Sequence, residues 1–215
     1  MNSREAILAR IRAAQGRSGP PSPQERDEAA AYIRAHPQGP RPRSDWDLVA
    51  RFSERAATLA TSVDRVGALG DVPPAVARYL QQHNLTNHAV CWPEFLELDW
   101  QAAGMHVEAR AAQGSDLVGI TGAYCAIAET GTLMLLSGAR TPATTSLLPE
   151  THIAVLRTER IVRGMEDAWH LLRGEHGAMP RAVNFISGPS RTADIEQTLV
   201  LGAHGPYRVH IVLTR

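Results

Sequence analysis

Residues 182–196 read Ala182-Val183-Asn184-Phe185-Ile186-Ser187-Gly188-Pro189-Ser190-Arg191-Thr192-Ala193-Asp194-Ile195-Glu196. The first six residues form a short, mostly apolar run that predicts a β-strand. From Ala193 to Leu201, apolar residues recur at helical spacing and predict a helix. A glycine- and proline-containing loop would join the two, with Thr192 or Ser190 as the N-cap residue. The unpaired N–H groups and positive dipole end of such a helix favour a bound anion.

The same alternation of short apolar runs and helical patterns extends back to residue 63. Strands are expected at residues 63–69, 88–92, 105–109, 118–121, 132–137, 153–156, 182–187 and 208–213. Helices are expected at residues 74–82, 123–128 and 164–172. This βα alternation predicts an α/β fold with a mostly parallel sheet flanked by helices.

The first 60 residues have a different character. Two amphipathic helices are expected at residues 3–14 and 24–35, each followed by a Pro/Gly/Arg segment, and a longer one follows around residues 46–60. We therefore divide the chain into a helical N-terminal appendage (residues 1–60) and an α/β domain (residues 61–215). The appendage is expected to pack on the main domain or on a second copy.

Composition excludes several classes of function. The chain has 22 basic and 22 acidic side chains, so it carries no general field toward nucleic acid or anionic membranes. It contains no lysine, which removes Schiff-base and P-loop lysine chemistry. Its two cysteines, Cys91 and Cys125, are too few for an iron–sulfur cluster held by this chain alone, and no metal motif is present. No signal peptide or apolar membrane span is recognisable, so the cytoplasm is the expected location.

Glu129 is the one carboxylate in a stretch of glycine and small residues, 119–132. Burial among apolar groups would raise its pKa, and it could then serve as an acid, a base or a nucleophile. Alternatively, it caps a turn or pairs with an arginine such as Arg191.

Arg191 and His204 are two further candidates. The planar fork of Arg191 suits a carboxylate or phosphate, although Asp194 and Glu196 could already complement the dipole of the expected helix. His204 lies in the glycine-rich segment 202–206, where it could donate to a ligand or exchange protons, or could be a hydrogen-bonded structural residue.

Four motifs occur in a fixed order: Ala128-Glu129-Thr130-Gly131-Thr132, Ser146-Leu147-Leu148-Pro149-Glu150-Thr151-His152-Ile153, the segment Gly188 to Glu196, and Gly202-Ala203-His204-Gly205-Pro206. Together they resemble the lactate-utilization protein C family, whose core is called the LUD domain. The resemblance covers the chain from about Val63 onward.

This resemblance implies a Rossmann-like fold similar to the ribose-5-phosphate isomerase, glucosamine-phosphate deaminase and CoA-transferase group. It also implies a part in bacterial oxidation of L-lactate to pyruvate, alongside partner proteins that carry the iron–sulfur clusters. In CoA-transferases of similar fold a glutamate is the nucleophile, which suggests Glu129 by analogy.

The predicted site combines these residues. Glu129 and His204 are the catalytic candidates, no metal ligand is proposed, and the candidates for binding a small carboxylate or phosphate are Thr130, Gly131, Thr132, Gly188, Pro189, Ser190, Arg191, Thr192 and Gly205. They are expected to converge at the carboxyl ends of parallel strands. Three functions remain open: a subunit of a lactate-oxidising system, an independent enzyme acting on a small phosphorylated or CoA-linked acid, and a purely structural docking partner.

Overall fold

The computed structural model describes residues 2–17, 19–41, 44–192 and 200–215, and the chain forms two compact units, Met1–Pro42 and Arg43–Arg215. The helices are α1 (Ser3–Ala14), α2 (Pro23–Ala35), α3 (Leu48–Thr58), α4 (Val72–Gln82), α5 (Thr144–Leu147) and α6 (Met165–Glu175). The strands are β1 (Thr61–Arg65), β2 (His88–Cys91), β3 (His106–Ala109), β4 (Val118–Gly122), β5 (Cys125–Ile127), β6 (Thr132–Leu136), β7 (Thr151–Arg157), β8 (Ile161–Val162), β9 (Val183–Ile186), β10 (Arg191–Thr192), β11 (Val200–Leu201) and β12 (Arg208–Thr214).

The first unit consists of α1 and α2, whose bounds agree closely with the helices expected at residues 3–14 and 24–35. Each begins with a capping box, formed by Asn2 with Glu5 and by Ser22 with Glu25. Neither helix buries a residue, and the side chains of Ile7 and Tyr32 are 55% and 69% exposed. Local capping therefore defines these helices, and they have no core of their own.

The third helix belongs to the second unit. Phe52 and Ala56 of α3 are fully buried in the main hydrophobic core. The boundary therefore falls between residues 42 and 43, and the division at residue 60 assigned α3 to the wrong side. The reason is packing: the apolar stripe of α3 is covered by the α/β unit itself.

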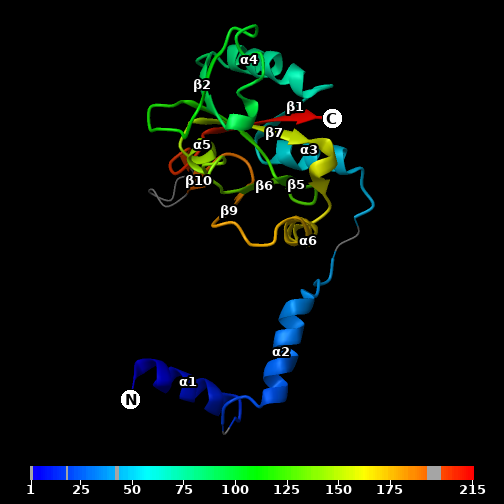
Figure 1. Cartoon of the computed structure of the whole chain (residues 1–215), viewed down its shortest axis with the longest axis vertical. Coiled ribbons are helices and arrows are strands. Elements are labelled where there is room, and N and C mark those ends of the chain that lie inside the picture. The colour runs from blue at the N-terminus through cyan, green and yellow to red at the C-terminus, as the bar shows by residue number, and fades with distance from the viewer. Residues whose placement is uncertain (1, 18, 42–43, 193–199) are drawn as a thin grey trace. The chain divides into compact units, whose positions relative to one another are not determined.

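A six-stranded sheet in the order β1-β12-β7-β4-β2-β3 forms the centre of the second unit (Figure 1). All of its strand pairs are parallel. The predicted Rossmann-like architecture, a mostly parallel sheet flanked by helices, is thus confirmed. Its central strands are buried on both faces, as expected for a parallel sheet covered on both sides.

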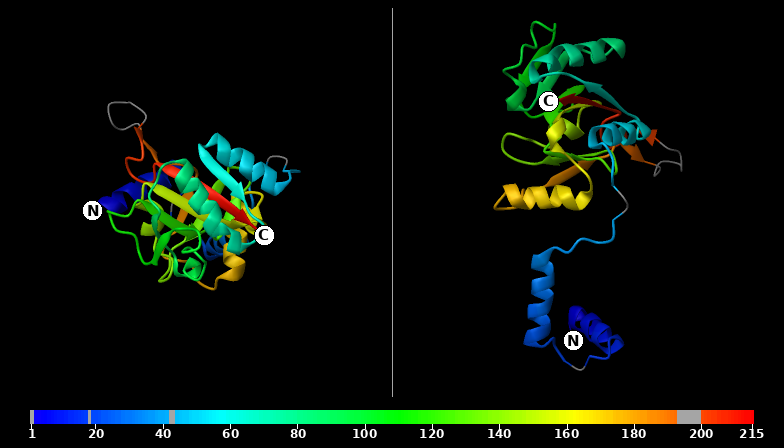
Figure 2. Two further views of the ribbon diagram at one scale, coloured as in Figure 1. Left: turned by 90° about the horizontal axis from the view of Figure 1, so that it is seen from above. Right: turned by 90° about the vertical axis from the view of Figure 1, so that its right-hand side faces the viewer.

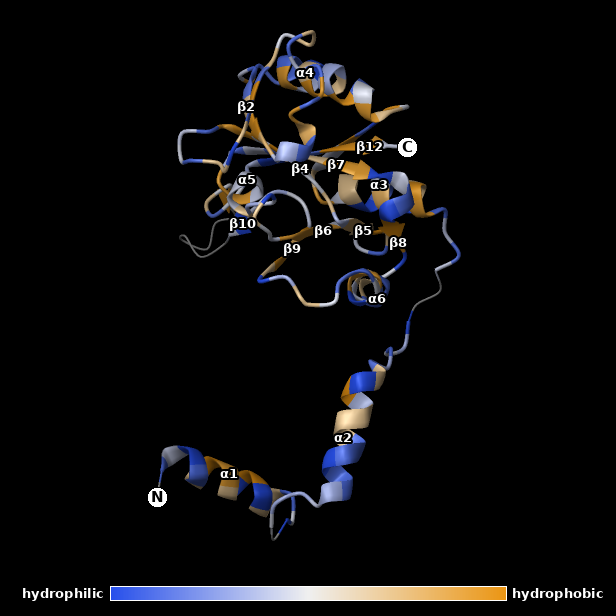
Figure 3. Cartoon of the chain, in the orientation of Figure 1, coloured by the Kyte–Doolittle hydropathy of each residue, from blue (hydrophilic) through white to orange (hydrophobic). Residues whose placement is uncertain are grey.

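Layers of helix and sheet enclose this core. Helix α4 covers one face of the sheet, where the ring of Tyr79 stacks on His210 of β12 at 3.9 Å between centroids. Helix α3 and a second sheet lie on the opposite face, and α6 covers the outer side of the second sheet (Figures 1 and 2). Colouring by hydropathy shows the apolar residues concentrated in the strands between these layers (Figure 3).

The second sheet has the order β8-β5-β6-β9 and is mixed, with β5 parallel to β8 and antiparallel to β6. The helix expected at residues 123–128 is wrong, because residues 125–127 form β5. Cys125, Ala126 and Ile127 are fully buried, Cys125 and Ile127 against α6 and Ala126 in the main core, so strand pairing and burial override the helical preference of alanine.

The sequence after β9 also differs from expectation. Arg191 and Thr192 pair with Leu201 and Val200 in a two-stranded antiparallel ribbon, β10–β11. Thr192 is therefore a strand residue and not an N-cap, and the predicted helix cannot extend to Leu201. Residues 193–199, including Asp194 and Glu196, lie outside the described residues.

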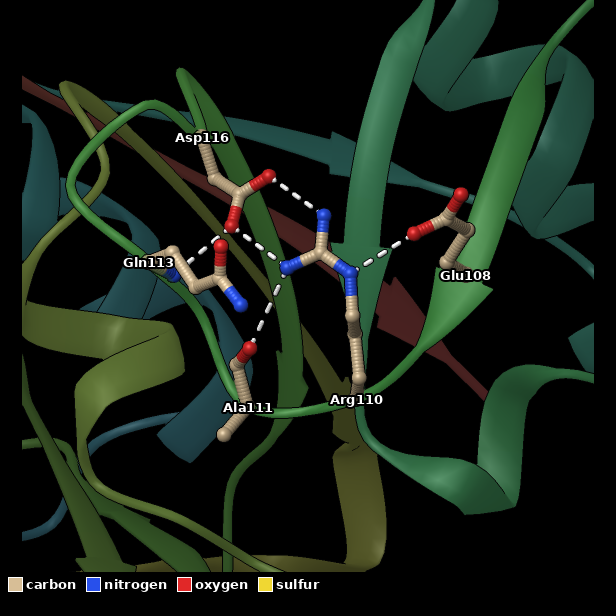
Figure 4. Close-up of polar contacts among 5 residues, drawn as sticks. All are labelled: Glu108, Arg110, Ala111, Gln113 and Asp116. Atoms are coloured by element: carbon tan, nitrogen blue, oxygen red, sulfur yellow. Dashed lines mark hydrogen bonds and ion pairs between the residues drawn. The ribbon is translucent and has the colours of Figure 1, made fainter.

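An ion-pair cluster fixes the connection between β3 and β4 (Figure 4). The guanidinium of Arg110 donates to both carboxylate oxygens of Asp116, at 2.6 and 2.7 Å, and to Glu108 at 2.6 Å. Asp116 also accepts from the Gln113 N–H. Bidentate geometry of this kind holds a connection in one conformation, and this one carries the chain from the edge strand β3 back to β4, on the other side of β2.

Candidate functional site

Glu129 lies at the N-terminus of α6. Its N–H donates to the Arg163 carbonyl, and a Cβ atom added at Gly164 would lie 3.2 Å from Glu129 Oε2, 3.6 Å from Glu166 Oε2 and 3.8 Å from Asp167 Oδ2. The expectation of apolar surroundings for this carboxylate is therefore wrong. Pairing of β5 with β8 brings Glu129 against the acidic first turn of α6.

The rest of the Glu129 motif packs on α3. Gly131 has a φ of 70°, and a Cβ atom there would lie 2.6 Å from the Ala56 nitrogen. The Thr130 hydroxyl donates to Thr132 Oγ1, which is hydrogen-bonded at 2.7 Å to the hydroxyl of Ser187. These hydrogen bonds join the start of β6 to the end of β9. Close packing against α3 explains why residue 131 is a glycine.

Gly188 makes a similar close approach. Its φ is 84°, and a Cβ atom would collide with the carbonyl oxygen of Leu59, just after α3. Pro189 is buried. The Gly188-Pro189 turn is therefore shaped by its packing against the end of α3.

Ser190 connects to the glycine-rich segment 202–206. Its N–H donates to the Pro206 carbonyl, and its own carbonyl accepts from the Gly202 N–H, both at 2.9 Å. A Cβ atom at Gly205 would lie 3.2 Å from Ser190 Cβ. Two of the recognised motifs thus meet directly, through backbone hydrogen bonds and close contact.

A pocket of about 660 Å³ lies beside this junction. We call it the motif pocket; it is lined by Leu147, Leu148, Glu150, Leu201, Gly202, Ala203, His204, Gly205, Tyr207 and Arg208. Of the predicted site residues, only His204 and Gly205 line it. Glu129 is at α6, which lies on a different side of the unit from the β10–β11 ribbon (Figures 1 and 2).

The motif pocket lies at the amino ends of β7 and β12, since Thr151 and Arg208 are paired at the starts of these strands. The expectation that His204 would lie at the carboxyl ends is therefore wrong. The reason is connectivity: segment 202–206 directly precedes β12 and so reaches its amino end.

The motif pocket combines apolar groups with charged groups of both signs, since Glu150 lines it together with Arg208. His204 is exposed, and the Arg208 guanidinium lies 4.7 Å from the centre of the Tyr207 ring. Leu147, Leu148, Leu201 and Tyr207 expose 40%, 52%, 39% and 46% of their surface. Such a surface can accept an anion with an apolar part or an apolar segment of another protein.

A second cleft, which the sequence reasoning missed, lies at the opposite edge of the sheet. We call it the carboxyl-edge cleft; it consists of two cavities of about 500 and 480 Å³, which share Glu94, Gly122, Ala123 and Tyr124 as lining residues. Glu94 lies in the loop just after β2, and Gly122 ends β4. A carboxylate two residues after the end of the expected strand 88–92 was the signal that could have identified it.

The wall of this cleft is rigid. Arg160 donates to both oxygens of Glu175, at 2.6 and 2.9 Å, and to the Tyr124 carbonyl, while the Tyr124 hydroxyl donates to Glu175. Hydrogen bonds from Arg160 and Tyr124 lower the pKa of Glu175 to about 2. Burial and the bond to Glu175 raise the pKa of Tyr124 to about 12.

No helix among the described residues is long and apolar enough to cross a membrane. Within the same residues, no group of three His, Cys, Asp or Glu side chains is arranged to hold a metal ion. Both cysteines are free and buried, and burial raises the pKa of each to about 11.

The family description "LUD domain" matches residues 53–214, which is most of the chain. The chain belongs to the LUD domain family. This match includes α3 from Ser53 onward, in agreement with the packing of that helix on the core.

Relatives of this LUD domain protein carry one recurrent name. "Lactate utilization protein C" from Halalkalibacterium halodurans is 32% identical over 77% of this chain and 78% of its own length. The protein of that name from Anoxybacillus flavithermus is 39% identical over 54% of this chain, which spans about half (51%) of that relative. The crystal structure of a "duf162 family protein" from Deinococcus radiodurans is 25% identical, covers 81% of this chain and 100% of its own, and has a TM-score of 0.61.

Proposed function

We propose that this LUD domain protein is a component of a bacterial L-lactate utilisation system that oxidises lactate to pyruvate. The observation that carries the proposal is the alignment with the lactate utilization protein C of H. halodurans, which extends over 78% of that protein. A protein with this role would contribute ligand binding and contacts to partner subunits.

Iron–sulfur clusters would belong to the partner proteins. A cluster is held by cysteine thiolates. Both cysteines of this chain are buried, with pKa values raised to about 11, so their thiols stay protonated at neutral pH. This chemistry supports a subunit that acts beside the redox centres.

The motif pocket is the proposed site for the small anionic ligand. His204 and Arg208 supply hydrogen-bond donors, the Arg208 guanidinium supplies positive charge, and Gly205 lines the pocket where it packs against Ser190. Arg191 lies on the β10–β11 ribbon that also supplies Leu201 to this pocket. A carboxylate or phosphate would meet these groups while its apolar part contacts Leu147 or Tyr207.

A docking role is the second candidate, favoured by the four exposed apolar side chains around the motif pocket. Exposed apolar residues that cluster in this way are typical of protein–protein contacts. In that case Leu147 and Leu148 would contact a partner subunit, and His204 would contribute little.

Growth and co-purification test these alternatives. Deletion of the gene in its host should abolish growth on L-lactate, and the wild-type chain should restore growth and co-purify with iron-containing proteins. His204→Ala and Arg208→Gln should fail to restore growth while retaining the partners if the pocket binds the anion. Leu148→Asp should lose the partners if the pocket docks them.

Normal growth on lactate after deletion would contradict a role in lactate utilisation. Turnover of small phosphorylated or CoA-linked acids by the purified chain alone, lost in Glu129→Gln, would instead identify an independent enzyme. Each variant must melt like the wild type, so that a growth defect cannot be attributed to unfolding.

A further inference from the structure

The carboxyl-edge cleft lies where the strand order of the parallel sheet reverses. From β2 the chain passes outward to β3, and it then returns to the other side of β2 and proceeds through β4, β7 and β12. The loops after β2 and β4 therefore diverge at their carboxyl ends. Ligands of open α/β sheets bind at such a reversal, and both cavities of the cleft open there, beside Glu94 and Gly122.

Glu94 is brought against the backbone at this point. A Cβ atom at Gly122 would lie 2.5 Å from Glu94 Oε1 and 3.4 Å from Phe95 Cζ, so the absence of a side chain at Gly122 makes room for the carboxylate. No described residue donates a hydrogen bond to the Glu94 carboxylate. Its oxygens are thus available to a ligand in either cavity.

Two arginines provide positive charge around Glu94. Arg157 ends β7 and lines one cavity, and its contact with Glu159 is long, at 3.9 Å, with 64% of the Arg157 side chain exposed. Arg140 lies in the turn that is closed by the β-bridge between Gly138 and Thr141, and these two residues line the other cavity. Arg160, in contrast, is already neutralised by its two hydrogen bonds to Glu175.

Burial raises the pKa of Glu94, and the charges of Arg157 and Arg140 partly offset this. The carboxyl group therefore retains its proton to higher pH than an ordinary glutamate and can donate as well as accept a hydrogen bond. An apolar surface made of Leu69, Phe95 and Val155 completes the first cavity.

We propose that the carboxyl-edge cleft binds a small organic acid, with its carboxylate between Arg157 and Arg140 and a hydroxyl or carbonyl oxygen hydrogen-bonded to Glu94. The two cationic groups suit the carboxylate. The apolar wall of the first cavity suits a short carbon chain, and the cavity volumes limit the ligand to small-molecule size. This site is independent of the motif pocket, which lies at the amino ends of the strands.

Calorimetric titration with pyruvate, L-lactate and inorganic phosphate tests the proposal. Wild-type protein should bind at least one of the two carboxylates saturably, and Arg157→Gln should weaken that binding by about tenfold or more, as expected for loss of a charge-assisted contact. Arg65→Gln is the matched control, because it removes one exposed arginine that lines neither the cleft nor the motif pocket, and it should leave this binding unchanged. Arg208→Gln is a separate variant that tests whether the same acid binds in the motif pocket.

Three results would overturn the proposal. Absence of saturable carboxylate binding, or binding of phosphate alone, would show that the cleft does not bind a small organic acid. Weakening by Arg208→Gln alone would assign the anion to the motif pocket, which would refute this site and support the proposed function. Equal weakening in Arg157→Gln and in the control Arg65→Gln would indicate a general effect of charge.

The pH dependence of carboxylate binding tests the role of Glu94 separately. Carboxylate affinity of the wild type should rise as the pH falls through the raised pKa of Glu94, whereas Glu94→Gln should bind with little pH dependence. The other charged neighbours are Arg140, Arg157 and Arg160, and an arginine side chain is charged at every pH used here. Glu175, Cys91 and Tyr124 have pKa values of about 2, 11 and 12.

His176 lines the second cavity, and histidine is the residue type whose ordinary pKa lies closest to neutral pH. His176→Gln is therefore the control and should retain the pH dependence of binding. A pH dependence that persists in Glu94→Gln and disappears in His176→Gln would refute the role assigned to Glu94.

Discussion

Substitution of Gly131 by alanine tests whether this motif glycine is required for packing. At a φ of 70° an alanine costs roughly 1 to 2 kcal/mol from backbone conformation. The added methyl group would lie 2.6 Å from the Ala56 nitrogen and 2.7 Å from the Arg55 carbonyl carbon, and both are backbone atoms of α3 that cannot rotate away. Overpacking of this kind costs about 1 to 3 kcal/mol, so the total loss should be about 2 to 5 kcal/mol.

Gly104→Ala is the matched control. Gly104 has nearly the same φ, 72°, but a Cβ atom there has no neighbour within 4 Å. Its substitution should cost only the conformational part, about 1 to 2 kcal/mol. The difference between the two variants isolates the contact between Gly131 and α3.

Urea denaturation followed by circular dichroism gives both free energies of unfolding. The melting temperature should fall by roughly 2 to 4 °C for each kcal/mol in a domain of this size. If Gly131→Ala were no more destabilising than Gly104→Ala, the packing explanation would fail. A stable Gly131→Ala variant that no longer supports growth on lactate would indicate a ligand-binding role for this turn.

Three further predictions concern the buried polar groups and the wall of the carboxyl-edge cleft. Thr121→Val should destabilise the protein by about 1 to 3 kcal/mol, because it removes the 2.8 Å hydrogen bond to His152 Nε2 in the core. Thr121→Ser keeps the hydroxyl, so its free energy of unfolding, measured by urea denaturation, should fall less. Burial lowers the pKa of His152 to about 3. The stability of the folded protein should therefore decline as the pH falls from about 6.5 toward 3, by at most about 1.4 kcal/mol per pH unit. If the urea midpoint of His152→Gln fell as steeply with pH as that of the wild type, this prediction would be wrong. Because the pKa of Glu175 is lowered, its ion pair with Arg160 should stabilise the fold above about pH 4.5 and lose this effect as the pH falls toward 2. Glu175→Gln should remove this part of the acid dependence of the melting temperature. If the melting temperature of the variant changed with pH as that of the wild type does, the pair would contribute nothing to stability.

Local sequence patterns identified most elements of the fold correctly. The runs at residues 88–92, 105–109 and 208–213 correspond to β2, β3 and β12, and the helices at 74–82 and 164–172 correspond to α4 and α6. These segments have strong periodicity, and their local preference agrees with their final environment. The prediction for residues 123–128 failed because alanine favours a helix, whereas the segment pairs as a strand with β6, which follows it, and with β8, which is distant in sequence.

The candidate site was predictable only in part. Motif order correctly indicated the family, and the meeting of Ser190 with segment 202–206 agrees with grouping these two motifs. Spacing could not reveal that Glu129 contacts the first turn of α6, since that depends on the pairing of β5 with β8. Nor could spacing reveal that Glu94 lines a cleft, since the position of that cleft depends on the strand order.

The sequence by itself determined the α/β class, the parallel strands and the family, because each follows from local periodicity or from short motifs in a fixed order. Only the tertiary structure decided that α3 belongs to the core, that His204 lies at the amino ends of the strands, and that Glu94, Gly122 and Arg157 share a cleft. The physical reason is that strand order and helix packing join residues far apart in the chain. A linear pattern records which side chains are available, and the strand order of the folded sheet determines which of them meet.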